Sequence, residues 1–248
     1  MLCTTPPDEG ATFFMNEGKT ISLCVTSFNR MEWTIRSFHD VLYDDRISEI
    51  VISDDASDLS VYAQLENAVG GMDKVRLLRN PKNYGCYLNK RRVVQASDEG
   101  YCILLDSDNV ISTSFVDKIF EQQWDEHTIL APDMGEPALN YKALSGKVLT
   151  KENISGLLDI GNTAMCLNTC NFFVNRNQYL SVFDDSVEPW TSDSILLNYC
   201  WLAAGNKIHI VDGLEYHHEI HKDSHYVLNN GKNPEFYTEV MNKLRKLK

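Results

Sequence analysis

The sequence lacks any long uninterrupted apolar run. None approaches the roughly 18 residues that a membrane-spanning helix requires, so we expect no such helix. Residues 1–19 carry Pro6, Pro7 and acidic residues, and they lack both the basic start and the apolar core of a secretory signal. We therefore expect no signal peptide, and we expect residues 1–19 to form an extension with little structure.

Positive charge is also in short supply. The 248 residues include 23 Lys and Arg against 35 Asp and Glu, which gives a formal net charge of −12. Because a protein that binds nucleic-acid phosphates needs a basic face, this balance argues against a nucleic-acid partner. An acidic protein that handles anionic nucleotides needs local compensation from a metal ion or from a few well-placed cationic side chains.

The cysteine pattern argues against a disulfide framework. The seven cysteines are odd in number and contain no C-x-x-C pair, since Cys166 and Cys170 lie four apart. Cys24, Cys102 and Cys200 lie in apolar stretches and are typical of core residues. We expect reduced thiols and a cytoplasmic setting. The hydrophobic fraction of 43% and the charged fraction of 23% are ordinary for a soluble globular protein.

One stretch joins a buried strand to two carboxylates. Residues 101–105 are mostly apolar without alternation, which predicts a strand buried on both faces of an α/β sheet. Asp106 and Asp108 follow, at the edge where open α/β sheets bind ligands. Two carboxylates this close repel each other unless a cation or proton intervenes. A hard divalent ion, Mg²⁺ or Mn²⁺, suits such oxygen ligands, and a solvated acidic turn is the alternative.

Strand and helix patterns alternate through the first half of the chain. The expected elements are strands at 20–26, 47–53, 74–79 and 101–105, with helices at 31–42, 61–69 and 87–97. This order predicts an α/β fold with a doubly wound, mostly parallel, Rossmann-like sheet and helices on both faces. Thr26, Asp54, Asn80 and Asp106 each fall at or just after the carboxyl end of a strand, so we expect them to converge at one edge.

Four short motifs carry a family resemblance through their order and spacing. They are Val25-Thr26-Ser27-Phe28-Asn29-Arg30, Ile52-Ser53-Asp54-Asp55-Ala56-Ser57, Asn83-Tyr84-Gly85 and Leu105-Asp106-Ser107-Asp108. They resemble the nucleotide-binding half of a family 2 glycosyltransferase with the GT-A fold. The resemblance implies transfer of a sugar from a nucleotide-sugar donor, by default a UDP-sugar, with inversion at the anomeric carbon and with Mn²⁺ or Mg²⁺ as cofactor.

The resemblance also implies roles for particular residues. Thr26 and Asp54 would contact the base and ribose, Asp108 would bind the metal, and Asp106 would lie near the ribose and the metal. The other residues expected at the nucleotide-sugar are Ser27, Phe28, Asn29, Arg30, Asn83, Lys90 and Ser107. A carboxylate such as Asp54 can accept a hydrogen bond from a uracil N–H, or it could cap the following helix. Lys90 could lie near the diphosphate or on an exposed helix face.

The second half of the chain is less regular. The expected elements are a helix at 112–123, a strand at 128–131, a strand turning into a helix at 171–176, a helix at 195–204 and a strand at 207–211. Residues 132–165 look irregular, and the resemblance places acceptor recognition near them. We expect a single GT-A domain at 20–248. Its parts are a nucleotide-sugar half at 20–111, a smaller acceptor-side and catalytic region at 112–225, and a tail at 226–248.

The catalytic base is expected near the predicted helix at 195–204. Ser192-Asp193 stands where the family usually has a Glu-Asp pair, and the resemblance makes Asp193 the general base that takes the acceptor proton. Asp193 could instead be a carboxylate favoured at a helix N-terminus. Glu188 is the fallback base. Trp190 and Ser192 are the candidates for acceptor contact, although Trp190 could equally be a packed core aromatic.

Histidines cluster near the end of the chain, where four of the seven lie between His217 and His225. The resemblance implies that one of them is an additional metal ligand. Tyr216-His217 matches that position best, with His218 and His221 as rivals. A solvated histidine-rich loop is the alternative.

The tail from Met241 to Lys248 is basic and partly amphipathic. It could contact anionic lipid at the inner face of a membrane, which would suit a lipid-linked acceptor in place of a free glycan. It could also be an ordinary helix end with cations at its C-terminus. Two other functions stay open. A sugar-1-phosphate nucleotidylyltransferase would want a glycine-rich loop after the first strand, and residues 26–30 contain no glycine. A non-catalytic module that binds a nucleotide or glycan is the other.

Overall fold

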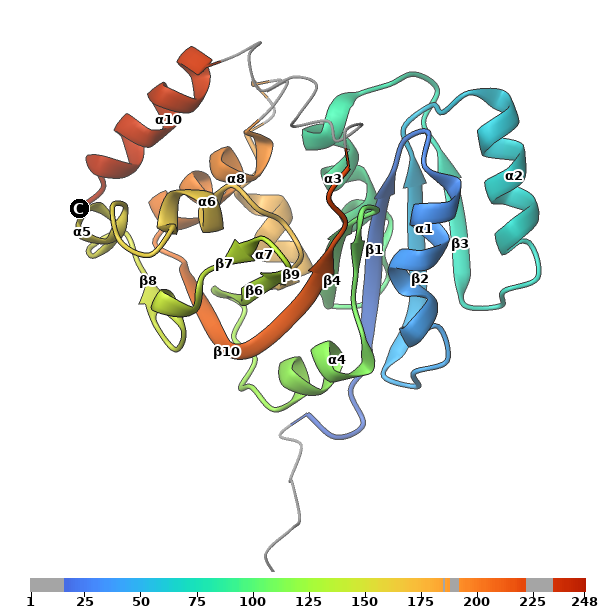
Figure 1. Cartoon of the computed structure of the whole chain (residues 1–248), viewed down its shortest axis with the longest axis horizontal. Coiled ribbons are helices and arrows are strands. Elements are labelled where there is room, and N and C mark those ends of the chain that lie inside the picture. Colours follow the sequence, from blue (N-terminus) through green and yellow to red (C-terminus); the bar gives the residue numbers. More distant parts are fainter. Residues whose placement is uncertain (1–15, 185, 188–191, 222–233) are drawn as a thin grey trace, which may run out of the picture.

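The structure is a computed structural model that describes residues 16–184, 186–187, 192–221 and 234–248. One curved sheet runs through the molecule with helices on both sides (Figure 1). The first half supplies β1 (Ile21–Ser27), α1 (Met31–Phe38), a 3₁₀ turn (His39–Val41), β2 (Ile47–Asp54), α2 (Leu59–Val69), β3 (Val75–Arg79), α3 (Gly85–Ala96) and β4 (Tyr101–Asp106). These elements match the predicted strands and helices to within a few residues.

The second half completes the same sheet. It supplies β5 (Asn109–Val110), α4 (Thr113–Phe120), β6 (Thr128–Glu136), β7 (Leu139–Asn140), a 3₁₀ turn (Lys142–Leu144), β8 (Val148–Leu149), α5 (Ile154–Leu157), α6 (Thr163–Leu167), β9 (Phe172–Asn175), α7 (Arg176–Ser181), α8 (Asp193–Ala203), β10 (Lys207–His218) and α10 (Pro234–Arg245). Strands from both halves therefore share one backbone hydrogen-bonding network.

The sheet is mostly parallel, as predicted. Its strand order is β3-β2-β1-β4-β9-β6-β10-β5, with β7 paired to β6 and β8 paired to β10. The pairs among β3, β2, β1 and β4 are parallel, and so is the pair of β6 with β10. β9 runs antiparallel to both of its neighbours, β4 and β6. This reversed strand joins the nucleotide-binding half to the second half.

Alternation along the strands divides the core into two layers. Successive strand residues point to opposite faces, so Cys102 and Leu104 of β4 pack with α3, α7, α8 and α10. Ile103 and Leu105 pack on the other face with α1, α2 and α4. All four side chains have no exposed surface. The apolar run in this stretch is thus explained by a strand that is covered on both faces, as expected.

Two predictions about the second half are wrong. Residues 132–165 are not irregular throughout, because β6 continues to Glu136 and β7, β8, α5 and most of α6 follow. The final strand does not end at 211 but continues to His218 as β10. Its pairing with β6 shifts between Val211 and Glu215, and Gly213 within that shift has a φ of +70°. The bulge breaks the sequence alternation, which made one strand look like a strand followed by a loop.

The basic tail forms α10, which packs beside α5 and α8 (Figure 1). Its apolar residues Val240, Met241 and Leu244 are buried in the core, so its apolar side is not free to enter lipid. Two of its cations are paired within the protein, Lys243 with Glu239 and Arg245 with Asp159. The expectation of an amphipathic lipid contact through this tail is therefore not met by the fold.

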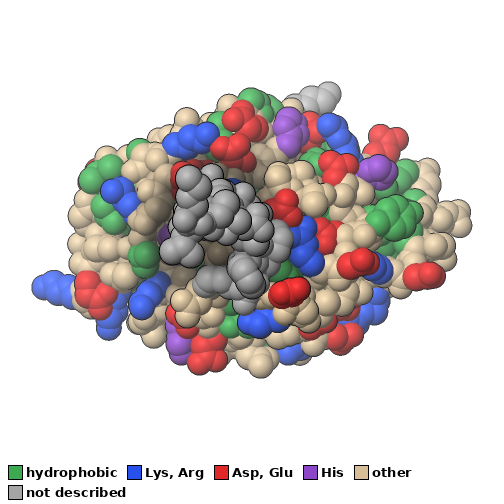
Figure 2. All heavy atoms as spheres, turned by 90° about the horizontal axis from the view of Figure 1, so that it is seen from below, with side chains coloured by type: hydrophobic (Ala, Val, Ile, Leu, Met, Phe, Trp, Pro, Cys, Tyr) green, Lys and Arg blue, Asp and Glu red, His purple; other side chains and the backbone are tan. Residues whose placement is uncertain are grey.

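One face of the molecule shows a surface of mixed charge. On the face drawn in Figure 2, acidic and basic side chains are interspersed, and hydrophobic side chains are scattered among them. Within the described ranges, no helix has both the length and the apolar character needed to cross a bilayer. All the cysteines that the structure describes are free thiols, as expected, although Cys200 is only partly buried.

Candidate active site

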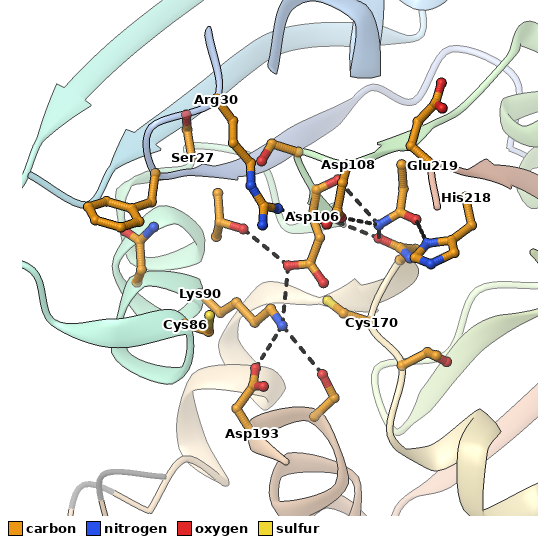
Figure 3. A pocket seen from close by; sticks show the side chains of 18 of the residues that line it. Ser27, Arg30, Cys86, Lys90, Asp106, Asp108, Cys170, Asp193, His218 and Glu219 are labelled. Carbon is orange, nitrogen blue, oxygen red and sulfur yellow. Dashed lines mark hydrogen bonds and ion pairs between the residues drawn. The ribbon is translucent and has the colours of Figure 1, made fainter. Parts of the chain in front are cut away.

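A cleft of about 340 Å³ opens at the carboxyl ends of β1 and β4. Its walls come from both halves of the chain: the loop after β1, the start of α3, the residues after β4, the loop before β9, the start of α8 and the end of β10. The side chains in Figure 3 converge on it from these elements. Of the four residues that the sequence analysis expects at this edge, Thr26 and Asp106 line the cleft, whereas Asp54 and Asn80 do not.

Asp106 lies on the floor of this cleft. Thr26 is its register partner on β1, and the Thr26 hydroxyl donates a hydrogen bond to Asp106 Oδ1 at 3.1 Å. The backbone N–H of Asp106 donates to Asn171 Oδ1 at 3.0 Å. Removal from water raises the pKa of Asp106; Lys90 opposes this shift, while Asp108 and Asp193 add to it. Asp106 is thus held by neighbours on both sides of β4.

Lys90 lies between two carboxylates. Its ammonium is 2.7 Å from Asp193 Oδ2 and 3.2 Å from Asp106 Oδ1, and its side chain is only 6% exposed (Figure 3). Burial alone would lower the pKa of Lys90, but the attraction of the two carboxylates outweighs it and holds that pKa well above its usual value. The alternative of an exposed helix face is therefore wrong for Lys90.

Asp108 meets one cation and one imidazole. Arg30 Nη1 lies 2.7 Å from Asp108 Oδ2, and His221 Nε2 lies 3.1 Å from the same oxygen. Asn109 Nδ2 donates to the other carboxylate oxygen at 3.1 Å. The His221 ring packs edge-on against Trp33, with ring centroids 4.2 Å apart, which fixes its orientation.

The expected ligand His217 does not face the cleft. Consecutive residues of β10 point to opposite faces, so His218 faces inward and its Nδ1 lies 2.7 Å from Asn109 Oδ1. Burial lowers the pKa of His218, and the nearby Asp108 opposes this only in part. His217 is 48% exposed, lies 3.5 Å from Glu219 and is not part of the cleft lining. The rival His221 is the histidine that reaches Asp108, after β10 has ended.

Asp54 does not line the cleft either. Its carboxylate is fully buried and accepts hydrogen bonds from the hydroxyl and the backbone N–H of Ser57, with Arg79 Nη1 at 3.4 Å. These contacts close the turn into α2 and leave no face for a uracil, which corrects the base-contact expectation. The next residue, Asp55, lines the cleft instead.

Asp55 organises the start of α3. Its carboxylate accepts the backbone N–H groups of Tyr84 at 2.9 Å and Gly85 at 2.8 Å, and an Asn80 amide at 2.8 Å. Gly85 has a φ of +80°, a conformation that favours glycine. Asn83 also accepts from Gly85, at 2.9 Å, and lines the cleft. The sequence analysis did not single out Asp55 as a site residue, although two consecutive acidic residues at the end of β2 indicated a second carboxylate there.

The loop after β1 has mixed roles. Asn29 lies outside the cleft, because its backbone N–H donates to Ser57 Oγ and its side-chain oxygen accepts the Asp58 N–H. Ser27 lines the cleft, but its hydroxyl is 2.8 Å from Thr34 Oγ1. Phe28 is 43% exposed at the cleft wall, so its ring is available for stacking. Ser107 is buried and also lines the cleft.

Asp193 is the first residue of α8. Ser192 precedes it with a φ of +66° and lines the cleft beside it. A helix N-terminus favours a negative charge, and the Lys90 ammonium lies 2.7 Å from Asp193 Oδ2. The fallback base Glu188 and the acceptor candidate Trp190 lie outside the described residues.

Asn171 is a site residue that the sequence pattern did not indicate. Its φ is +79°, and its side-chain oxygen accepts from Asp106 N–H and, at 3.3 Å, from Asn109 Nδ2. Asn tolerates positive φ better than most residues. An asparagine at the start of a predicted strand was a weak signal, because nothing local shows that this strand pairs with β4.

The fit of a divalent metal can be tested on these residues. Over the part of the chain that the structure describes, no group of three or more His, Cys, Asp or Glu side chains is placed to hold a metal ion. One pair is suitable, because the Asp108 and His221 ligand atoms are 3.1 Å apart. Adjacent ligands of an octahedral ion with bonds of about 2.1 Å lie about 3 Å apart. Two protein ligands are sufficient when a substrate diphosphate supplies others.

The sequence of the first half of the chain matches a known family model. Residues 22–142 match the sequence model described as glycosyl transferase family 2. This match covers just under half of the chain, and it shows that this segment is similar to glycosyl transferase family 2. The matched glycosyltransferase segment contains β1 to β6 and both carboxylates after β4. Comparison with curated protein sequences gives no significant match.

Solved glycosyltransferase structures share the fold. S. aureus TarS 1-349 in complex with UDP-GlcNAc superposes with a TM-score of 0.64 at 15% identity, over 91% of this chain and 65% of that one. The complex of the same protein with UDP gives 0.61 at 13% identity, over 91% and 64%. GalNAc-T7 with UDP, GalNAc and Mn²⁺ gives 0.58 at 14% identity, over 80% and 43%. The present chain thus spans just under two thirds of TarS 1-349, and its GT-A fold is confirmed.

Proposed function

We propose that the protein is an inverting glycosyltransferase that moves a sugar from a nucleotide-sugar to a hydroxyl of a glycan or lipid-linked acceptor. One observation carries the proposal. Asp106 and Asp108, at the end of β4, share a single cleft with Asp193, at the start of α8. A donor-side acidic motif and a separate carboxylate are what a single displacement needs, since one end handles the leaving group and the other handles the proton.

The donor end of the cleft suits a nucleoside diphosphate. Phe28 offers an exposed ring for a base, and Arg30 brings a cation to the acidic motif. Such cations supply the local compensation that a protein of net charge −12 needs to hold an anionic donor. UDP is the nucleotide we propose, because the TarS and GalNAc-T7 structures of the same fold are complexes with UDP or UDP-GlcNAc.

We assign the divalent ion, Mn²⁺ or Mg²⁺, to Asp108 and His221. The spacing of their ligand atoms fits neighbouring positions around such an ion, and both side chains are only 11% exposed. The ion, when bound, would neutralise charge that develops on the leaving diphosphate. Asp106 is not part of this assignment, because the histidine ligand atom lies beside Asp108 and one Asp106 oxygen is engaged by Thr26 and Lys90.

Asp193 acts as the general base. It takes the proton of the acceptor hydroxyl while the oxygen forms a bond to the anomeric carbon. The bond from that carbon to the diphosphate oxygen breaks on the opposite face, and the electron pair leaves with the diphosphate. The Lys90 ammonium lies 2.7 Å from the Asp193 carboxylate, which stands at the N-terminus of α8, where a helix favours negative charge.

The direct test is a panel of nucleotide-sugars, assayed for UDP release and for glycosylated product with and without Mn²⁺. Asp193→Asn should lower transfer by about 10²–10⁴-fold, the usual contribution of a general base, while UDP binding persists. The matched control is Asp98→Asn, which alters a carboxylate that is 84% exposed and outside the cleft lining. Full transfer by Asp193→Asn would refute the base assignment.

The remaining alternatives are outcomes of the same panel. A binding module would take up UDP without turning over any donor, and a nucleotidylyltransferase would release pyrophosphate from a nucleoside triphosphate. An α-configured donor that gives a β-configured product, read by NMR, supports inversion. We keep the single domain at 20–248 and the cytoplasmic setting as proposals.

A further inference from the structure

We propose that Lys90 is a positioning residue that ties the base Asp193 to Asp106, and that it is not a ligand of the donor diphosphate. This inference rests on the proposed function, because it assumes that Asp193 is the base. It also replaces the sequence-based expectation, which put Lys90 at the nucleotide-sugar.

The hydrogen-bonding capacity of Lys90 is the first argument. A protonated lysine has three N–H donors. Three oxygens surround the Lys90 nitrogen: Asp193 Oδ2 at 2.7 Å, Asp106 Oδ1 at 3.2 Å and Ser194 Oγ at 3.4 Å. All three donors therefore have acceptors inside the protein, and a diphosphate oxygen could bind only by displacing one of them.

The position of Lys90 in the fold is the second argument. It comes from the middle of α3, on the first-half side, and it reaches Asp193 and Ser194 in the first turn of α8. Figure 3 shows its side chain extended between β4 and α8, with the amine pointing at both carboxylates. One buried cation thus connects the motif that handles the donor to the residue that handles the acceptor proton.

The surroundings of Asp193 leave Lys90 as its close cationic partner among the described residues. The described titratable groups that face this region include Asp106 at the end of β4, Asp108 just after it, Arg30 after β1, Cys86 on α3, Cys170 before β9 and Tyr179 on α7. Burial raises the pKa of the Cys86 thiol to about 12, so this thiol is neutral. Arg30 is engaged with Asp108, so its charge is directed to the other end of the cleft.

Loss of the Lys90 charge should therefore change the base and spare the donor site. Without it, Asp193 and Asp106 repel each other, so Asp193 becomes easier to protonate and its carboxylate loses a fixed orientation. The hydrogen bonds and ion pairs described for Lys90 go to Asp193, Ser194 and Asp106 and not to the proposed donor-binding residues Phe28, Arg30 and Asp108, so nucleotide affinity should be retained.

The experiment measures kcat, donor KM, UDP affinity and the pH profile of kcat for Lys90→Met and Lys90→Arg. In Lys90→Met we expect the acid limb of the profile to move up by at least one pH unit and kcat at pH 7 to fall more than tenfold. UDP affinity should stay within threefold of the wild type. Lys118→Met is the matched control, because it removes an ammonium that pairs with Glu121 outside the cleft lining.

Lys90→Arg keeps the charge but replaces the three-donor ammonium with a planar fork. We expect its acid limb to stay at the wild-type pH, its kcat to fall and its UDP affinity to hold. If Lys90→Met does not fold, Lys90→Arg still distinguishes a positioning residue from a ligand of the diphosphate. The inference is overturned if either variant weakens UDP binding tenfold or more while its kcat profile is unchanged, because that result describes a diphosphate ligand.

A thermal-unfolding cycle separates this inference from the base assignment. It compares Lys90→Met, Asp193→Asn and the double variant, and coupling between the two residues is expected whichever residue is the base. If the shift in Tm of the double variant equals the sum of the two single shifts, the proposed link between Lys90 and Asp193 is rejected. Coupled shifts together with an active Asp193→Asn would instead reject the proposed base and leave the contact standing.

Discussion

His221 and His217 allow a sharp test of the metal site, because they are close in sequence and separate in space. His221 is 11% exposed, with its Nε2 3.1 Å from Asp108 Oδ2, whereas His217 is 48% exposed and is not part of the cleft lining. We predict that His221→Ala weakens Mn²⁺ binding and that His217→Ala does not. The sequence alone favoured the opposite result.

The size of the effect follows from the ligand count. The cleft offers Asp108 and His221 as a ligand pair, so His221→Ala removes one of two protein ligands. Loss of a residue that merely supports a ligand costs about 10–100-fold in metal affinity, so loss of a ligand should cost at least that. This factor corresponds to about 1.4–2.8 kcal/mol of binding free energy. His217→Ala, at an exposed position, should change stability by no more than about 0.5 kcal/mol.

The assay is the paramagnetic resonance signal of free Mn²⁺, titrated with protein in the presence of saturating UDP. UDP binding without metal, measured by calorimetry, shows whether each variant still folds around the nucleotide. If His217→Ala weakens Mn²⁺ binding and His221→Ala leaves it intact, the assignment of Asp108 with His221 is refuted.

Two further predictions concern stability. Gly135→Ala should lower the free energy of unfolding by about 1–3 kcal/mol, because its Cβ would lie 2.6 Å from the buried Tyr216 ring, and Gly100→Ala, with open space around it, is the control in a thermal melt. The pKa of Glu49 lies below its usual value because, although burial opposes this, hydrogen bonds from Ser22, Asp98 N–H and Arg76 outweigh it. This contribution to stability is present above the unfolded-state pKa of about 4.3 and is lost as the pH falls through the folded pKa. Thermal melts of Glu49→Gln should therefore show a flatter acid limb than the wild type, and an equally steep limb would contradict the reasoning.

Local pattern was enough to determine the first half of the fold. Apolar runs of strand length alternate there with helical periodicity, and parallel strands joined by helices must place their carboxyl ends at one edge. Thr26 and Asp106 therefore had to lie at the same edge once both strands formed, and they meet because β4 pairs directly with β1. The same reasoning could not extend to β9, because its antiparallel pairing with β4 depends on contacts between distant segments.

Only the tertiary structure decided which of several residues adjacent in sequence lines the cleft and which is buried elsewhere. Asp54 and Asp55 differ by one position, yet one closes a buried turn and the other lines the cleft. Adjacent residues of a strand or turn point in different directions, so an error of one position moves a side chain to another face. Lys90 is a second case. A buried cation needs carboxylates close by, and Lys90 meets Asp106 and Asp193. Which ones it meets depends on how α3, β4 and α8 pack, and that packing is not visible in any local stretch of sequence.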